Sequence, residues 1–257
     1  MRLRALSCVA ALVLTGMVLA GTAAAQDRVE PVRGPDRGTQ VRVHGIQVLP
    51  ATDRPFSARD HIEWTRNLED GTVIKTELYA TVARDGQGRI YREHRSFVPL
   101  ASNEQSRQID LILLDPVAHK RTTCVIRTRR CIVTGYHTSA EFVLNPDGLL
   151  DKGTRFLTRE NTGHNVIDGL DVTGTRETLQ IVAGAVGNSQ TLVSTREFWY
   201  SPALQVNLTV TRKDPRVGTQ ILQLVDLSLA EPDPALFRVP TGYKVQKLER
   251  ESAEPAD

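Results

Sequence analysis

Apolar and polar residues alternate with a period of two along most of the chain after residue 55. The clearest case is 204–210, where Leu204, Val206, Leu208 and Val210 alternate with polar residues without a fault. In 73–82, one side of the alternation collects Ile74, Thr76, Leu78, Ala80 and Val82. A period of two gives each strand one dry and one wet face, as in antiparallel sheets. No segment keeps a helical period over 12 residues. The pattern predicts a mainly β protein built on an antiparallel sheet with few short helices.

Turn sequences divide this pattern into neighbouring strands. Asp70-Gly71 and the run 85–88 suit the tight turns of hairpins, and the run 214–218 links the last two strands of the pattern. Residues 137–164 are mixed, and we assign only a helical turn within 149–159. We expect a single antiparallel β domain over residues 56–248, which is long enough to bury a core.

The two ends of the chain differ from this domain. Arg2 and Arg4 precede an apolar stretch at 5–20, and the small residues 23–25 resemble a cleavage site, so residues 1–25 are predicted to be a secretory signal peptide. An uncleaved anchor fits less well, because a membrane span needs about 20 apolar residues with polar flanks on both sides. Residues 26–55 are rich in Pro, Gly and Arg and predict a loose N-terminal arm, and 249–257 form an acidic tail. We expect a periplasmic or secreted protein with no transmembrane segment after cleavage.

Composition and charge narrow the function by exclusion. The 257 residues are 40% apolar and 24% charged, which is close to the globular average and excludes a collagen, a coiled coil and a polytopic membrane protein. The formal net charge of +2 belongs to the leader, because loss of residues 1–25 removes Arg2 and Arg4 and leaves 30 basic and 30 acidic residues. We therefore expect no nucleic-acid partner, and any electrostatic function must come from a local cluster.

Two cysteines remain after cleavage, because Cys8 lies in the leader. Six residues separate Cys124 from Cys131, which fits a hairpin with the two cysteines opposite each other. In an exported, oxidising setting this spacing predicts a structural disulfide. A redox pair is the alternative, although the spacing is not Cys-x-x-Cys.

The same hairpin is basic and has no acidic residue between His119 and Cys131. Its cations are Lys120, Arg121, Arg127, Arg129 and Arg130. One interpretation is a patch that contacts an anionic partner, such as phospholipid head groups, lipopolysaccharide or a cell-wall polymer. The other is a solvated hairpin whose charges discourage pairing at a sheet edge.

Familiar catalytic and metal motifs do not occur in the sequence. His61 and Glu63 share one face of a predicted strand and His94 could approach them, yet no zinc-type spacing is present. The nucleophile elbow, the Walker loop and the dinucleotide fingerprint are also missing. We expect a non-enzymatic protein with no metal and no cofactor. An envelope hydrolase is the least favoured class.

The C-terminal half carries a more specific pattern. It resembles a group of uncharacterised exported bacterial proteins, common in acidobacteria, through the runs 167–178 (IDGLDVTGTRET), 183–188 (AGAVGN), 197–205 (EFWYSPALQ), 214–216 (DPR) and 231–243 (EPDPALFRVPTGY). The resemblance extends forward to the runs 70–72, 85–89 and 115–118.

More distantly, the end of the chain is similar to the periplasmic carriers of outer-membrane lipoproteins and their lipid-binding relatives. Such proteins often place an aspartate-containing turn and a Leu-Phe pair before a Pro-Gly segment and a last strand, here Asp233, Leu236-Phe237 and 240–242. The resemblance implies a strongly curved half-barrel whose concave face, lidded by helices, holds acyl chains. The amphipathic helix that these carriers show after the leader is missing here.

The leading expectation is therefore an exported protein that binds a lipid, a lipoprotein acyl chain or another amphipathic ligand in the concave face. The residues expected to line it are Trp64, Leu78, Phe198, Tyr200, Leu208 and Leu224. The same residues could instead form a closed core. The alternative is a structural or sensory module whose sheet edge or basic hairpin contacts another envelope protein.

Overall fold

The computed structural model describes residues 45–136 and 147–247, which all belong to one compact unit of the chain. The predicted signal peptide, the first part of the predicted arm and the acidic tail lie outside the described residues. Within them the protein is mainly β, and its two helices are short 3-10 turns, η1 (Asp151–Gly153) and η2 (Pro234–Phe237). The predicted fold class is confirmed.

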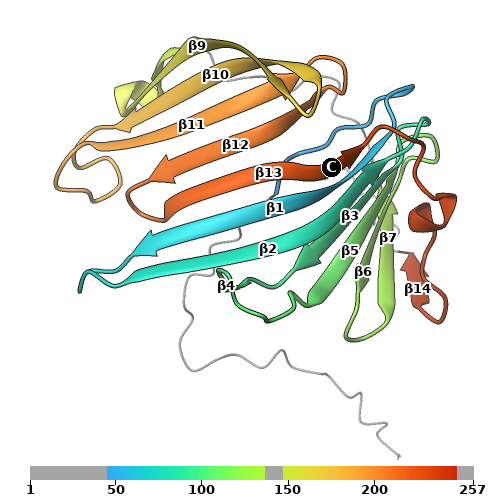
Figure 1. Ribbon diagram of the computed structural model, residues 1–257. Coiled ribbons are helices and arrows are strands. Elements are labelled where there is room, and N and C mark those ends of the chain that lie inside the picture. The colour runs from blue at the N-terminus through green and yellow to red at the C-terminus, as the bar shows by residue number, and fades with distance from the viewer. Residues whose placement is uncertain (1–44, 137–146, 248–257) are drawn as a thin grey trace, which may run out of the picture. The chain divides into compact units, whose positions relative to one another are not determined.

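The strands form a single curved sheet that does not close (Figure 1). They are β1 (Phe56–Asn67), β2 (Val73–Arg84), β3 (Ile90–Arg95), β4 (Val98–Pro99), β5 (Gln108–Asp115), β6 (Lys120–Val125), β7 (Arg130–Gly135), β8 (Gly148–Leu150), β9 (Arg155–Ile167), β10 (Leu170–Ile181), β11 (Leu192–Ser201), β12 (Val206–Asp214), β13 (Gly218–Ser228) and β14 (Lys244–Lys247). Their order is β14-β7-β6-β5-β3-β2-β1-β13-β12-β11-β10-β9-β8, with β4 paired to β2. Neighbours are antiparallel except for β14 and β7.

Three long strands, β9, β10 and β11, occupy a region that the sequence pattern left mostly unassigned. β9 illustrates the reason: most of its side chains are exposed or half-buried, and Leu157 alone is buried. Only the three-residue β8 lies beyond it at this edge of the sheet. A strand whose two faces are both exposed to solvent shows no alternation of apolar and polar residues, so its sequence does not predict it.

The larger apolar core lies on one face of the sheet, which we call the inner face. Most of its side chains come from β1, β2, β3, β12 and β13: Phe56, Ala58, Ile62, Leu78, Ala80, Val82, Ile90, Leu208, Val210, Leu222 and Leu224. The members of β2 in this core, Leu78, Ala80 and Val82, are even-numbered residues that the alternation placed on one side. Packing of this face is what fixes the register of the central strands.

The described part of the predicted arm is packed rather than loose. Ile46 and Val48 are 1% and 8% exposed and belong to the inner-face core. Arg84 is fully buried and donates hydrogen bonds to the carbonyls of Leu49 and Arg54 in this segment. Two apolar side chains and the hydrogen bonds that Arg84 donates therefore anchor residues 45–55 to the sheet.

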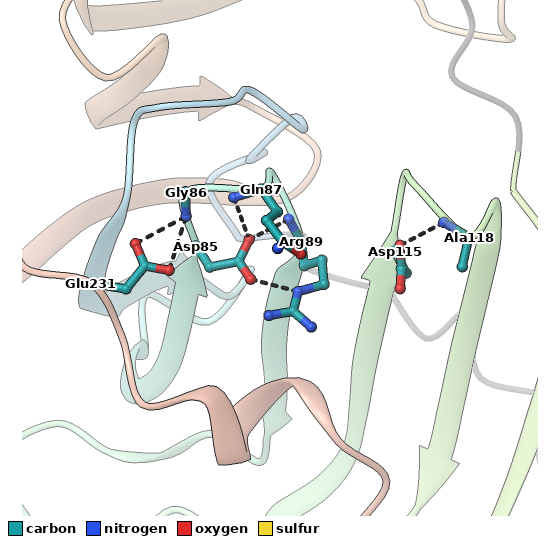
Figure 2. A network of polar contacts seen from close by, with 7 residues as sticks. All are labelled: Asp85, Gly86, Gln87, Arg89, Asp115, Ala118 and Glu231. Carbon is teal, nitrogen blue, oxygen red and sulfur yellow. Dashed lines mark hydrogen bonds and ion pairs between the residues drawn. The ribbon is translucent and has the colours of Figure 1, made fainter.

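A second apolar cluster lies on the opposite, outer face, between the β3–β7 strands and the C-terminal segment 229–243. Leu236, Phe237, Val239 and Tyr243 pack there against a buried group of Ala83, Tyr91, Leu111, Leu113, Cys124 and Cys131. Figure 2 shows how the segment is fastened at one end of the sheet: Glu231 accepts from the Gly86 amide at 3.1 Å, and Asp85 binds its own turn and the Arg89 side chain. The C-terminal segment thus covers the outer face over β3 and β5–β7.

Candidate functional site

Cross-strand register arranges the inner-face side chains in rows that run across the strands. One row, the apolar row, consists of directly paired residues of β2, β1, β13, β12 and β11: Leu78, Ile62, Leu222, Val210 and Phe198. The next row, two residues further along each strand, is the polar row. It runs from β2 to β9 through Thr76, Trp64, Gln220, Arg212, Arg196, Glu177 and Arg159. Two residues along a strand span about 7 Å, so the inner face changes from apolar to charged over that distance.

The structure places five of the six predicted lining residues on the inner face. Leu78, Leu208 and Leu224 are at most 5% exposed and lie within the core. Phe198 is half-buried in the apolar row, and Trp64 is half-buried in the polar row. Tyr200 does not join them: it is 40% exposed and follows an irregularity in the pairing of β11 with β12. The prediction thus found inner-face positions, but half of them are already covered by the protein's own chain.

Trp64 stands at the border between the two rows. Its indole nitrogen donates to the Val217 carbonyl at 2.7 Å, and its ring packs at a tilt against Phe97 with centroids 5.7 Å apart. The Arg66 guanidinium lies over the indole ring, 4.5 Å from its centroid. The aromatic surface is therefore held in a fixed orientation, with an apolar neighbour on one side and a cation on the other.

Asp60 is a buried carboxylate in the middle of this face, and sequence reasoning missed it. Its Oδ2 accepts from the Ile46 amide at 2.9 Å, and its Oδ1 has no hydrogen-bond partner among the described residues. Burial raises the pKa of Asp60 to about 6, and the positive charges of Arg92 and Arg212 only partly oppose this. The available signal was its position in β1, where it interrupts an otherwise apolar series of even-numbered residues.

Two arginines of the polar row face each other directly. Arg196 on β11 and Arg212 on β12 are cross-strand partners, and a like-charged pair in this position is destabilising. Burial lowers the pKa of Arg212, and Arg196 lowers it further, while Asp60 acts in the opposite direction. Glu177 neutralises part of the cluster, since it lies 2.8 Å from Arg159 and 3.6 Å from Arg196. The row therefore concentrates guanidinium groups beside an apolar surface.

The residues weighed as metal ligands lie on opposite faces. His61 and Glu63 share the outer face, as predicted, and His61 Nε2 is 3.1 Å from Glu77 Oε2 while its ring stacks on Tyr79. His94 is in the inner-face register, where its Nδ1 is 2.7 Å from Asp110. The expectation that His94 could approach the other two is therefore wrong. The described residues contain no group of three or more His, Cys, Asp or Glu that could hold a metal ion.

The hairpin of β6 and β7 contains the disulfide Cys124–Cys131, with both cysteines fully buried and directly paired. The hairpin's cations do not form one patch. Lys120 and Arg121 lie at the start of β6, whereas Arg127, Arg129 and Arg130 lie at the turn, about 17 Å further along the strand at five residue steps. All five are exposed, and the parallel pairing of β14 adds Lys244 beside Arg130.

Comparisons with known proteins give a likeness of fold at low identity. No family model matches the chain, and no curated protein does. Among solved structures, an uncharacterised conserved protein from Thermus thermophilus matches with a TM-score of 0.40 and 14% identity over 76% of this chain and 91% of that one.

LprF from Mycobacterium bovis follows with a TM-score of 0.27 and 17% identity over 69% and 89% of the two chains. A putative outer-membrane lipoprotein-sorting protein domain from Vibrio parahaemolyticus has a TM-score of 0.19 and 11% identity over 72% and 89%. These TM-scores are all below 0.5, so the ligand and activity must be argued from the chain itself. Neither helix in the described part of the chain is long and apolar enough to cross a membrane.

Proposed function

We propose that this protein is exported to the periplasm or the medium and binds a lipid, a lipoprotein acyl chain or another amphipathic ligand on its inner face, without catalysing a reaction. The observation that carries the proposal is the border between the apolar row and the polar row. An amphipathic molecule has the same border between its chain and its head. A surface that matches both the chain and the head binds the molecule more tightly than a surface that matches only one of them.

The apolar half of this surface already accommodates a segment that is not a strand. Ile46 and Val48 have no strand conformation, yet they pack among the inner-face side chains. Half-buried Phe97, Phe198 and Trp199 pack around the same cluster and provide aromatic surface at its margin. Because Leu78, Ile62, Leu222 and Val210 are at most 5% exposed, an apolar chain would lie against the half-buried aromatic side chains at this margin.

The test is native mass spectrometry of the protein purified from its own cell envelope. We expect a co-purifying lipid or acylated molecule, lost in Phe198→Asp but retained in the control Val193→Asp. Val193 is 48% exposed on the same strand and lies on the opposite side of the alternation. A wild-type protein that carries no lipid, and takes up no monoacylglycerol when it is offered, would contradict the proposal.

A second candidate function is contact with an anionic partner, favoured by the turn of the β6–β7 hairpin. Arg127, Arg129 and Arg130 are exposed there with Lys244, and none of the four has an ion-pair partner among the described residues. We propose contact with an anionic lipid surface at this turn. Charge reversal of the three arginines is expected to abolish binding to phosphatidylglycerol vesicles, and unchanged binding would refute it. Phosphatidylcholine vesicles are the control.

A further inference from the structure

We infer that the inner-face side chains of β5, β6 and β7, which we call the open wing, bind a single molecule of an anionic lipid. The acyl chain lies on the apolar side chains of the open wing, and the head group lies at Arg130 and Lys244. The inference goes beyond the proposed function, because β5, β6 and β7 contribute no residue to the border between the apolar row and the polar row.

The strands of the open wing have apolar side chains on both faces, but the described residues cover only one of these faces. On the outer face, Leu111 and Leu113 are at most 8% exposed beneath the C-terminal segment. On the inner face, Val125 and Ile132 are 40% and 42% exposed, and Ile112 is half-buried. Strands with apolar side chains on both faces are usually covered on both, and exposed apolar surface of this kind marks binding sites.

Cross-strand register arranges the side chains of the open wing in two adjacent rows. The first row contains two apolar side chains and a threonine: Ile112 of β5, Thr123 of β6 and Ile132 of β7. The second row, two residues further along each strand, contains Val125 of β6, Arg130 of β7 and Lys244 of β14. An acyl chain on the first row therefore lies about 7 Å from a row that ends in two cations.

The two cations are direct partners at the edge of the sheet, where β14 lies beside β7 (Figure 1). Both are exposed, and neither has an ion pair within the described part of the chain. The carboxylate in the same row, Asp110, lies two strands away from Arg130 and is 2.7 Å from His94 Nδ1. Like charges held side by side repel each other, and an oxyanion that accepts from both converts this repulsion into shared attraction.

The width of the open wing favours a lipid over a protein partner. Three neighbouring strands span about 10 Å, which is wide enough for one acyl chain. A stable protein interface buries about 800 Å² on each partner, far more than a few half-exposed side chains provide. An apolar stripe of this width with cations at one end matches a single-chain anionic lipid.

The test follows the δ1-methyl resonances of the isoleucines by NMR while lipid is added below its critical micelle concentration, so that only single molecules are offered. 1-Oleoyl lysophosphatidate should shift the resonance of Ile132 in a saturable manner. 1-Monooleoylglycerol has the same chain without the charge, and it should bind there about tenfold more weakly. The resonance of Ile221, which is paired with Glu63 on the outer face, should not shift.

Substitution of the two cations tests the head-group site. Lys244→Gln and Arg130→Gln should each remove most of the preference for lysophosphatidate and leave the binding of monooleoylglycerol unchanged. Lys247→Gln is the matched control, because Lys247 is also exposed on β14 but pairs with Val133 on the opposite face. This variant should keep the full preference.

Three results would overturn the inference: an Ile132 resonance that does not shift, equal affinities of the wild type for the two lipids, or a preference that survives both substitutions. Coverage of the open wing by the chain itself would overturn it as well. In that case Ile132→Ser would lower the melting temperature clearly more than Val193→Ser, at a residue of similar exposure.

Phe198→Asp separates this site from the proposed function. It should abolish the binding of a chain at the border of the two rows and leave the titration of Ile132 intact. Loss of the Ile132 shift in Phe198→Asp would overturn a separate site on the open wing and leave the proposed function standing. An Ile132 shift in a protein whose central face binds no lipid would support the open wing and refute the proposed function.

Discussion

At the scale of single residues, the inner face buries ionisable side chains. Asp60 and Arg84 both lie among apolar side chains, and they are stabilised in different ways. Arg84 donates to three backbone carbonyls, whereas one oxygen of Asp60 has no partner within the described part of the chain. A buried group with its hydrogen bonds satisfied stabilises a specific packing, while a partly satisfied one weakens it. The two residues should therefore respond in opposite ways to replacement.

The wild type should lose stability as the pH rises because Asp60 ionises, and the variant Asp60→Asn should lack this loss. The folded pKa of Asp60 is about 6, above its ordinary value of 3.8, so the folded protein holds this proton more tightly than the unfolded chain. Its stabilising contribution is complete below about pH 4 and is lost as the pH rises through 6. The difference in free energy of unfolding between the wild type and Asp60→Asn (wild type minus variant) should therefore fall by about 3 kcal/mol from pH 4 to pH 7.

Urea unfolding at a series of pH values measures this difference. Asp226→Asn, at an exposed position of the same sheet, controls for the loss of one carboxylate. A difference between wild type and Asp60→Asn that stays constant over this range would contradict the assignment.

Arg84→Met should destabilise the protein strongly. The substitution keeps the apolar stem but leaves the carbonyls of Leu49, Arg54 and Leu204 without this donor. We expect the free energy of unfolding to drop by about 3 kcal/mol or more. Arg216→Met, which removes an exposed ion pair with Asp214, should cost no more than about 1 kcal/mol. Similar losses for the two variants in chemical denaturation would show that Arg84 does not anchor these segments.

At the scale of elements, the sequence predicted the strands that have one dry face. The alternation in β1, β2, β12 and β13 is visible because their inner-face side chains are buried and their outer-face side chains are not. β9 escaped prediction because it has almost no buried residue, and the packing of residues 45–49 escaped because a Pro- and Gly-rich composition conceals two well-placed apolar side chains. Alternation along a strand indicates which side chains are buried. It does not indicate burial in a segment outside the strands, where tertiary contacts bury the side chains.

The hairpin of β6 and β7 should depend on its disulfide. The bridge closes a loop with a sequence separation of seven, which corresponds to about 2–3 kcal/mol of lost chain entropy in the unfolded state. The oxidised protein should therefore exceed the reduced protein in free energy of unfolding by that amount, and thiol titration of the denatured, unreduced protein should find neither Cys124 nor Cys131 free. Two titratable thiols from this hairpin would contradict the bridge.

At the scale of the whole molecule, the site arises from register, which no single segment contains. Trp64, Arg196 and Arg212 are far apart in the sequence and belong to three different strands, and only the pairing of β1 with β13, β13 with β12 and β12 with β11 places them in one row. Sequence reasoning could select apolar inner-face positions such as Phe198 and Leu208. It could not select the charged members of the polar row, because each of them resembles an ordinary surface residue within its own strand.

The central claim, that the inner face binds the chain of an amphipathic ligand, is tested most directly by the fluorescence of Trp64. The chain has two tryptophans, so Trp199→Phe leaves Trp64 as the only emitter. A monoacylglycerol with a dibrominated chain should quench this emission in a saturable manner, while the same lipid with an oleoyl chain should not, because bromine quenches only at close contact. Saturable quenching that is lost in Phe198→Asp is the predicted result. Binding of the brominated lipid without any quenching of Trp64 would place the ligand elsewhere and contradict the account.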